Sequence, residues 1–200
     1  MPKDFETRES WLSGDGPWHL NGYTWPIQGN ASFGPNHWWR YASGFGEAGD
    51  RLLHSILSDD NYDSLDILVM PTLFVYRHYI ELAIKAADRS IADLLGEETT
   101  AGKDRDHTVL ERWNRVFERI SKLPGGESKR FSEADQFIAE LEMHDPRSFA
   151  FRYPESNKGE PHVQNLPWVN YARLAAAISR VKEAINYIEG AISYAHDCSR

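Results

Sequence analysis

The segment VYRHYIELAIKAADR, residues 75–89, carries charged side chains at helical spacing between apolar ones. On a helix, Arg77, Glu81 and Lys85 line one flank at steps of four residues, and His78 lies beside Glu81 at a step of three. These residue types could cleave RNA through its 2′-hydroxyl, because that reaction needs a base, an acid and a cation beside the phosphorane. The alternative is an exposed ladder of ion pairs, each of which adds about 0.3 kcal/mol to the stability of a helix.

A second histidine, His107, directly precedes the next predicted helix. Together with Arg77 and His78 it completes a candidate catalytic set that needs no metal. The alternative is structural, with His107 capping that helix and bonding to Glu81 across the bundle. In that case His107 ties helices together and takes no part in catalysis.

A second candidate constellation lies in the polar segment 144–167, which is longer than most structural connections and of a length that is often functional. Arg152 either pairs with an acid such as Glu81 or faces a pocket beside Arg77. In the second case the two guanidinium groups could clamp a phosphate. The candidate ligand-binding residues are Glu81, Lys85, Asp145, Arg152 and Tyr153.

Amphipathic helices must position these residues, because apolar side chains recur at steps of three and four along most of the chain after residue 36. We expect a first helix from residue 37 to about 56, with glycines that indicate a kink or the close approach of another backbone. A second begins near Pro71 and ends at about Leu95, and the pentapeptide before Pro71 is its lead-in.

The third predicted helix begins at a capping box formed by Thr108 and Glu111 and ends before LPGGESKR. A short helix follows Ser132, and the last runs from about Pro167 to Ala195. No segment shows the alternation of a sheet. The fold class is therefore all-α, a bundle of four to five helices over residues 37–200.

Residues 1–36 form a different segment, rich in glycine, proline and aromatic residues. Glycine and proline exclude a long helix there, while the aromatic content argues against free disorder. We expect an irregular arm packed on the bundle. Its tryptophans either plug one end of the bundle or offer a platform for a partner chain or for unstacked bases, which stack with about 1–3 kcal/mol each.

The composition narrows the classes of function. The chain has 200 residues, a formal net charge of −8 and one cysteine. The acidic balance argues against a protein that coats nucleic acid or an anionic membrane through its overall field, so that any polyanion site must be local. A single cysteine, no signal pattern and no apolar run near the roughly 20 residues of a membrane span predict a cytoplasmic protein. Metal-ligand spacings are absent, and we expect neither a metal nor a cofactor.

Three motifs carry a family resemblance: FVYRHYIELAIKA, then DHTVLERW, then DPRSFAFRYP. They resemble the bacterial helical-bundle families grouped as HEPN, which show an Arg-His-x-x-Glu-Leu-x-x-Lys helix and a His-Asp-Leu-like start of the next one. The resemblance covers roughly residues 68 to 195. The sequence departs from the pattern of these families in one respect. Their ribonucleases have an arginine followed by four to six residues and then a histidine, and no arginine of this chain has that spacing.

The resemblance implies a bundle that often dimerises and that occurs in toxin–antitoxin and phage-defence proteins, many of them metal-independent endoribonucleases. One hypothesis is therefore a defence or toxin–antitoxin effector that binds RNA or a nucleotide at Arg77, His78, His107 and Arg152. The other is a noncatalytic interaction or dimerisation module, or a subunit of a larger assembly, in which the polar flank of the second helix braces the bundle. Both lead us to expect a homodimer or a protein partner and no membrane.

Overall fold

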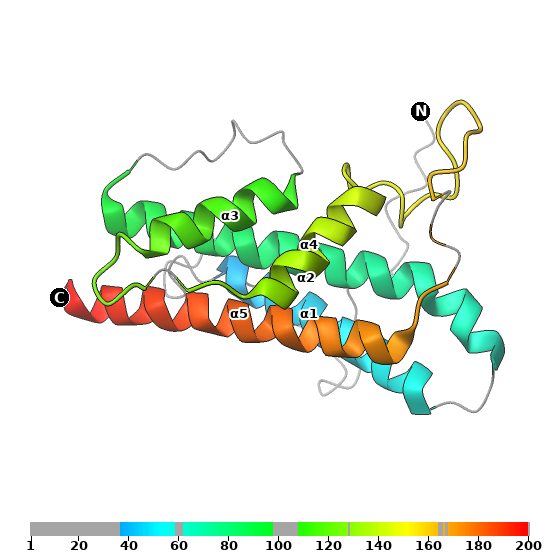
Figure 1. Cartoon of the computed structure of the whole chain (residues 1–200), viewed down its shortest axis with the longest axis horizontal. Helices are drawn as coiled ribbons and strands as arrows, with labels where there is room; N and C mark the ends of the chain where they lie inside the picture. Colours follow the sequence, from blue (N-terminus) through cyan, green and yellow to red (C-terminus); the bar gives the residue numbers. More distant parts are fainter. Residues whose placement is uncertain are drawn as a thin grey trace, which may run out of the picture. The chain divides into compact units, whose positions relative to one another are not determined.

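The structure is a computed structural model that describes residues 37–58, 62–97, 108–127, 129–163, 166 and 168–199. These residues form five helices and no strand, which confirms the predicted all-α bundle (Figure 1). The helices are α1 (His37–Ser58), α2 (Tyr62–Leu95), α3 (Val109–Ile120), α4 (Ser132–His144) and α5 (Tyr171–Cys198). The predicted arm, residues 1–36, and the candidate His107 lie outside the described residues.

Helix α2 is the central element of the bundle, and α3 and α5 pack on it. The apolar stripe predicted for this helix is buried, from Leu73 and Tyr76 to Ile91. Residues on its other faces are buried too, among them Tyr79 and Ile84. A helix that is apolar all round has to be enclosed by its neighbours, which accounts for its central place.

The start of α2 differs from the prediction, because the helix begins at Tyr62 and Pro71 lies inside it. An interior proline removes one backbone hydrogen bond, crowds the preceding turn and costs about 3 kcal/mol. Packing offsets this cost, since Leu65 and Leu68 lie against the core and the Tyr171 hydroxyl of α5 donates to the Leu65 carbonyl. Figure 1 shows α2 changing direction in this N-terminal part.

The N-terminal end of α3 also differs from the prediction. Thr108 lies at the N-cap position, but its side chain bonds to the Glu111 carboxylate at 3.1 Å and makes no capping bond to the backbone. The cap comes from α4 instead, where Glu142 Oε2 accepts the backbone N–H of Val109 at 3.0 Å. A carboxylate is favoured at this end of a helix by the macrodipole, so the capping charge also ties α4 to α3.

Helix α3 is held to α2 by charged groups as well as by apolar packing. Asp88 of α2 is buried and accepts hydrogen bonds from Arg115 at 2.9 Å and Arg119 at 2.5 Å. Trp113 of α3 is fully buried, and its indole N–H donates to Asp135 of α4 at 2.6 Å. These bonds link α2, α3 and α4.

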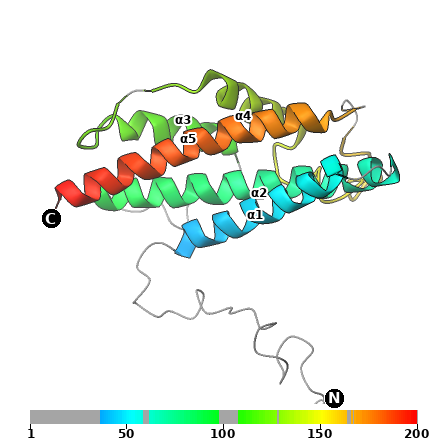
Figure 2. The same cartoon turned by 90° about the horizontal axis from the view of Figure 1, so that it is seen from below.

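Helix α1 packs on α2 through its glycines (Figure 2). It is also joined to α5, where Lys182 donates a hydrogen bond to Asp50 of α1. A Cβ at Gly49 would lie 2.7 Å from the Tyr76 ring, and a Cβ at Gly46 would lie 3.1 Å from the Tyr79 ring. The close approach predicted for these glycines is therefore to aromatic side chains of α2 and not to the backbone of another helix.

Helix α2 is also long and apolar enough over Leu65–Leu95 to cross a bilayer, which differs from the sequence expectation that no run approaches this length. Of its most apolar stretch, 56% is buried inside the bundle. The core helix of a bundle can be as long and as apolar as a membrane span, and α2 is the core helix here.

Candidate functional site

The Arg77 side chain, which the sequence singles out, lies inside the bundle. It is 1% exposed and makes ion pairs with two carboxylates, at 3.1 Å to Glu81 of the same helix and at 3.2 Å to Asp145. Its Nε also donates to the backbone carbonyl of Asp145 at 3.1 Å. A guanidinium can be buried only when its charge and its N–H groups are satisfied, and these acceptors serve that purpose.

Lys85 and Asp145 extend this cluster in two directions. Lys85 Nζ lies 2.6 Å from the second oxygen of Glu81 and reaches toward solvent, so Glu81 is shared by two cations. Asp145 follows the end of α4, and its Oδ1 accepts the backbone N–H of Ala150, which folds the start of the following loop. The cluster thus has two carboxylates and two cations, and it joins α2 to the loop after α4.

Glu142 lies close to this cluster as well as at the start of α3. Burial raises the pKa of its carboxyl; the N–H groups of Val109 and Leu110 and the nearby Arg77 guanidinium lower it, and the Asp145 carboxylate raises it. The direction of the net shift is upward, so burial outweighs the favourable partners. The cluster therefore touches α2, α3, α4 and the loop, and its residues are better placed to brace the bundle than to meet a substrate.

His78, one residue after Arg77, lies in an aromatic environment. Its ring is stacked on Phe74 at 5.9 Å and meets the edge of Phe45 of α1 at 4.4 Å. Burial lowers the pKa of His78, Glu81 raises it, and Lys85, Arg152 and Arg77 lower it. The net shift is downward, which favours the neutral imidazole in the folded protein.

Arg152 and Tyr153 lie on the surface, in an aromatic group that also includes Phe74 and Phe149. The Arg152 guanidinium is 4.9 Å from the centre of the Phe149 ring, 5.6 Å from that of Tyr153 and 5.9 Å from that of Phe74. Its Nε donates to the Ser148 carbonyl. Arg152 therefore stacks on aromatic rings, and in the described part of the chain it forms no ion pair with an acid.

The structure thus divides the predicted site residues into two groups. Arg77, Glu81, Lys85 and Asp145 form one internal ion cluster, while His78, Arg152 and Tyr153 belong to the aromatic group around Phe74. The exposed-ladder interpretation fits only the Lys85 end, because Arg77 and Glu81 are buried.

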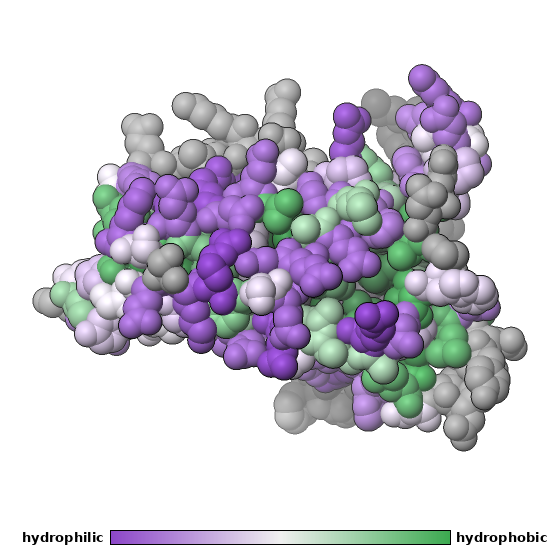
Figure 3. Space-filling model, in the orientation of Figure 1, coloured by the Kyte–Doolittle hydropathy of each residue, from purple (hydrophilic) through white to green (hydrophobic). Residues whose placement is uncertain are grey.

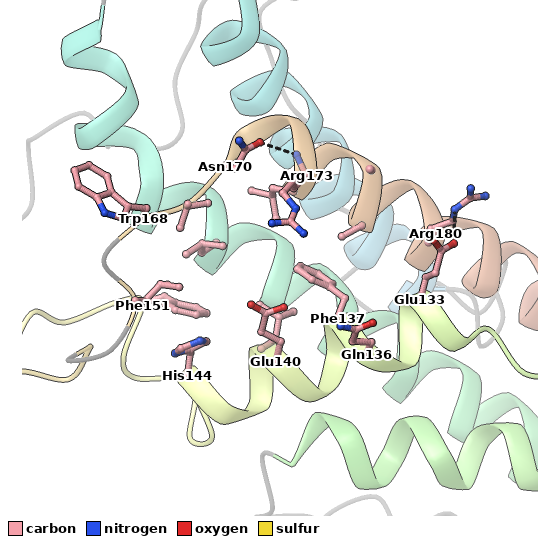
Figure 4. Close-up of a pocket in the computed structure, with 17 residues that line it drawn as sticks. Glu133, Gln136, Phe137, Glu140, His144, Phe151, Trp168, Asn170, Arg173 and Arg180 are labelled. Atoms are coloured by element: carbon pink, nitrogen blue, oxygen red, sulfur yellow. Dashed lines mark hydrogen bonds and ion pairs between the residues drawn. The ribbon is translucent and has the colours of Figure 1, made fainter.

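A feature that sequence reasoning missed is a groove between α4 and α5, with a volume of about 790 Å³ (Figure 4). Apolar side chains form its floor, and the exposed Trp168 lies at one end. The floor residues are Leu73, Phe137, Leu141, Phe151, Leu174 and Ala177. Hydrophilic residues cover much of the face in Figure 3, and apolar ones gather toward the end of the bundle where α5 begins.

The walls of the groove carry charges of opposite sign. Glu133 and Glu140 project from α4, and Arg173 and Arg180 project from α5. At one end Arg180 bonds to Glu133 at 2.8 Å. The only sequence signals for this groove are the small residues of AAA at 175–177 and an arginine in the first turn of α5, where the helix dipole favours an acid.

Comparisons with known proteins give no relative for this chain: no family model, no curated protein and no solved structure matches it. The HEPN resemblance therefore stays a prediction, carried by its three sequence motifs alone. In the described part of the chain, no group of three histidine, cysteine or acidic side chains is arranged to hold a metal ion.

The buried ion cluster predicts a large loss of stability on Arg77→Met. Removal of the cation leaves Asp145 and Glu81 buried beside each other, and breaking a buried pair in this way costs about 3 to 5 kcal/mol. Adding Glu81→Gln and Asp145→Asn to the same chain should restore part of that loss, because the two acids no longer need a cation. Urea unfolding followed by circular dichroism measures both free energies of unfolding.

The matched control for this prediction is Arg51→Met on α1, where Arg51 forms an exposed pair with Glu47 at 2.8 Å. That variant should change the free energy of unfolding by less than about 0.5 kcal/mol. A loss on Arg77→Met as small as that of the control would contradict the bracing role.

The environment of His78 predicts a pH dependence of stability. Its pKa is lowered in the folded state from the ordinary value of 6.5, so the unfolded chain takes up a proton that the folded chain resists. This contribution to stability is present above pH 6.5 and is lost as the pH falls below it. The fall in free energy of unfolding between pH 7.5 and 5.5 should be smaller for His78→Gln than for the wild type. An unchanged slope in His78→Gln would contradict the prediction.

Proposed function

We propose that this chain is a noncatalytic helical interaction module, and that the α4–α5 groove receives a segment of a partner polypeptide. The observation that carries the proposal is the groove itself, with its apolar floor and charged walls. Trp168 at its end is 86% exposed, the most exposed of the large apolar side chains in the described residues. Aromatic residues of this kind often anchor protein interfaces.

The charge of the groove favours a polypeptide over a nucleic acid. Its two arginines are matched by two glutamates, and the whole chain has a net charge of −8. Binding of nucleic acid depends on an excess of cations that displaces counterions from phosphates. A surface with balanced charges and an apolar floor is better suited to an amphipathic polypeptide.

The arrangement of the predicted catalytic residues supports the same proposal. Arg77 already donates to Glu81 and Asp145 and is closed off from solvent. To act on a phosphate it would have to leave both carboxylates, which would leave two charges unpaired in the interior. The ribonuclease hypothesis stays a prediction, and its candidate His107 lies outside the described residues.

Site-specific photo-crosslinking in cells tests the proposal. A benzoylphenylalanine at Gln136, on the α4 wall, should give an adduct that protease removes and ribonuclease does not. The same group at Asn186, exposed on α5 outside the groove, should not give that adduct. Ala177→Trp fills the floor and should abolish the adduct at Gln136 in a chain that still shows the helical circular dichroism of the wild type.

Two outcomes would contradict the proposal. One is a Gln136 adduct that ribonuclease removes, and the other is an adduct that Ala177→Trp leaves unchanged. Incubation of the purified chain with total RNA in EDTA completes the test, because cleavage that is lost on Arg77→Met in a folded chain would instead establish a ribonuclease.

A further inference from the structure

Acid–base pairs face each other across the α4–α5 groove at equivalent positions, and one of them is left open. The helices run antiparallel, and Glu133 is bonded to Arg180 at 2.8 Å. Glu140 lies seven residues after Glu133 on α4, Arg173 lies seven residues before Arg180 on α5, and the two hold the corresponding places of a second pair. Both side chains reach into the space between the helices in Figure 4, and no ion pair joins them.

The fold gives no local reason for the arginine of this open pair. Arg173 is the third residue of α5, where the N-terminal end of the helix dipole disfavours a cation. Its guanidinium has no hydrogen bond or ion pair within the described residues, and the same holds for the Glu140 carboxylate. A residue placed against the local preference of its helix is expected where the sequence serves a function.

The length of the groove suits a short helix. Its lining runs from Glu133 to His144 along α4, eleven residue steps, which at 1.5 Å each correspond to roughly 16 Å or three turns. The floor residues between the walls, among them Phe137, Leu141 and Leu174, are apolar. A third helix laid between two antiparallel ones buries an apolar stripe on the floor and presents its two edges to the walls.

We propose that the occupant is an amphipathic helix of a partner polypeptide, with an apolar stripe bordered by basic residues on one edge and acidic residues on the other. The basic edge meets Glu140 and the acidic edge meets Arg173. Because only one direction of the helix pairs both edges correctly, the open pair also fixes the direction in which the partner binds. This inference rests on the proposed function and adds the chemistry of the partner.

Three synthetic helical peptides with the same leucine stripe test the charge assignment. One has lysine along one edge and glutamate along the other, the second has lysine on both edges, and the third has glutamate on both. Fluorescence anisotropy with the full chain should give the tightest binding for the mixed peptide. The other two should bind about tenfold more weakly, since each brings like charges together at one wall.

Charge reversal of a single wall should then change the preference. Arg173→Glu makes both members of the open pair acidic and should favour the lysine peptide, whereas Glu140→Arg makes both members basic and should favour the glutamate peptide. Glutamate suits the first turn of α5, so the first variant should fold. Lys122→Glu, the same change of charge at an exposed site after α3, is the control and should keep the wild-type order.

The outcomes separate this inference from the proposed function. Equal binding of the three peptides, abolished by Ala177→Trp, would keep the groove as a docking site and overturn the charge assignment. Binding of none of them would overturn the inference, while the crosslink at Gln136 decides the proposed function independently. Self-association of the wild-type chain that is lost in Arg173→Glu would identify a second copy as the occupant and would also overturn the inference.

Discussion

The buried Arg77 guanidinium is the constraint on which the rest of the bundle depends. A fixed cation inside a helical core requires carboxylates within reach, and these come from Glu81 on α2 and from Asp145 at the end of α4. Asp145 in turn holds the first residues of the following loop through the Ala150 N–H. One side chain of the central helix thus sets the position of α4 and of the loop that contributes Phe151 to the groove. Positioning of this kind is a specific role for a buried ion pair, whose net stabilisation is often small because desolvation opposes it.

The periodicity of the sequence predicts most of the fold. Apolar side chains at steps of three and four form one face of a helix, and that face has to be buried against other helices. The stripe of α2 and the buried Ile138 and Leu141 of α4 follow from it directly. Local signals fail where tertiary contacts replace them. Pro71 marks a helix start by preference, yet packing extends α2 beyond it, and Thr108 predicts a capping box, yet Glu142 of another helix provides the cap.

The candidate site shows the same limit. The sequence singles out Arg77, Glu81 and Asp145 by residue type, and the i to i+4 spacing predicts the contact of the first two. The sequence cannot show that Asp145, 68 residues after Arg77, lies against this flank of α2 and is buried with it. The α4–α5 groove could not be predicted either, because its walls come from helices whose register is set by packing. The structure therefore distinguishes two sets of charged residues. Arg77, Glu81 and Asp145 pair with one another inside the bundle, whereas Glu140 and Arg173 line the groove without a partner in the described residues.

The most direct test of this account is the side-chain Nε–H exchange of Arg77, measured by NMR on the isotopically labelled chain and assigned through Arg77→Lys. Because this group donates to Asp145 inside the bundle, its signal should persist after transfer to D₂O, long after that of the exposed Arg147 has disappeared. Exchange of the Arg77 signal as fast as that of Arg147 would contradict the account. It would place the guanidinium at the surface and return it to the candidates for binding a phosphate.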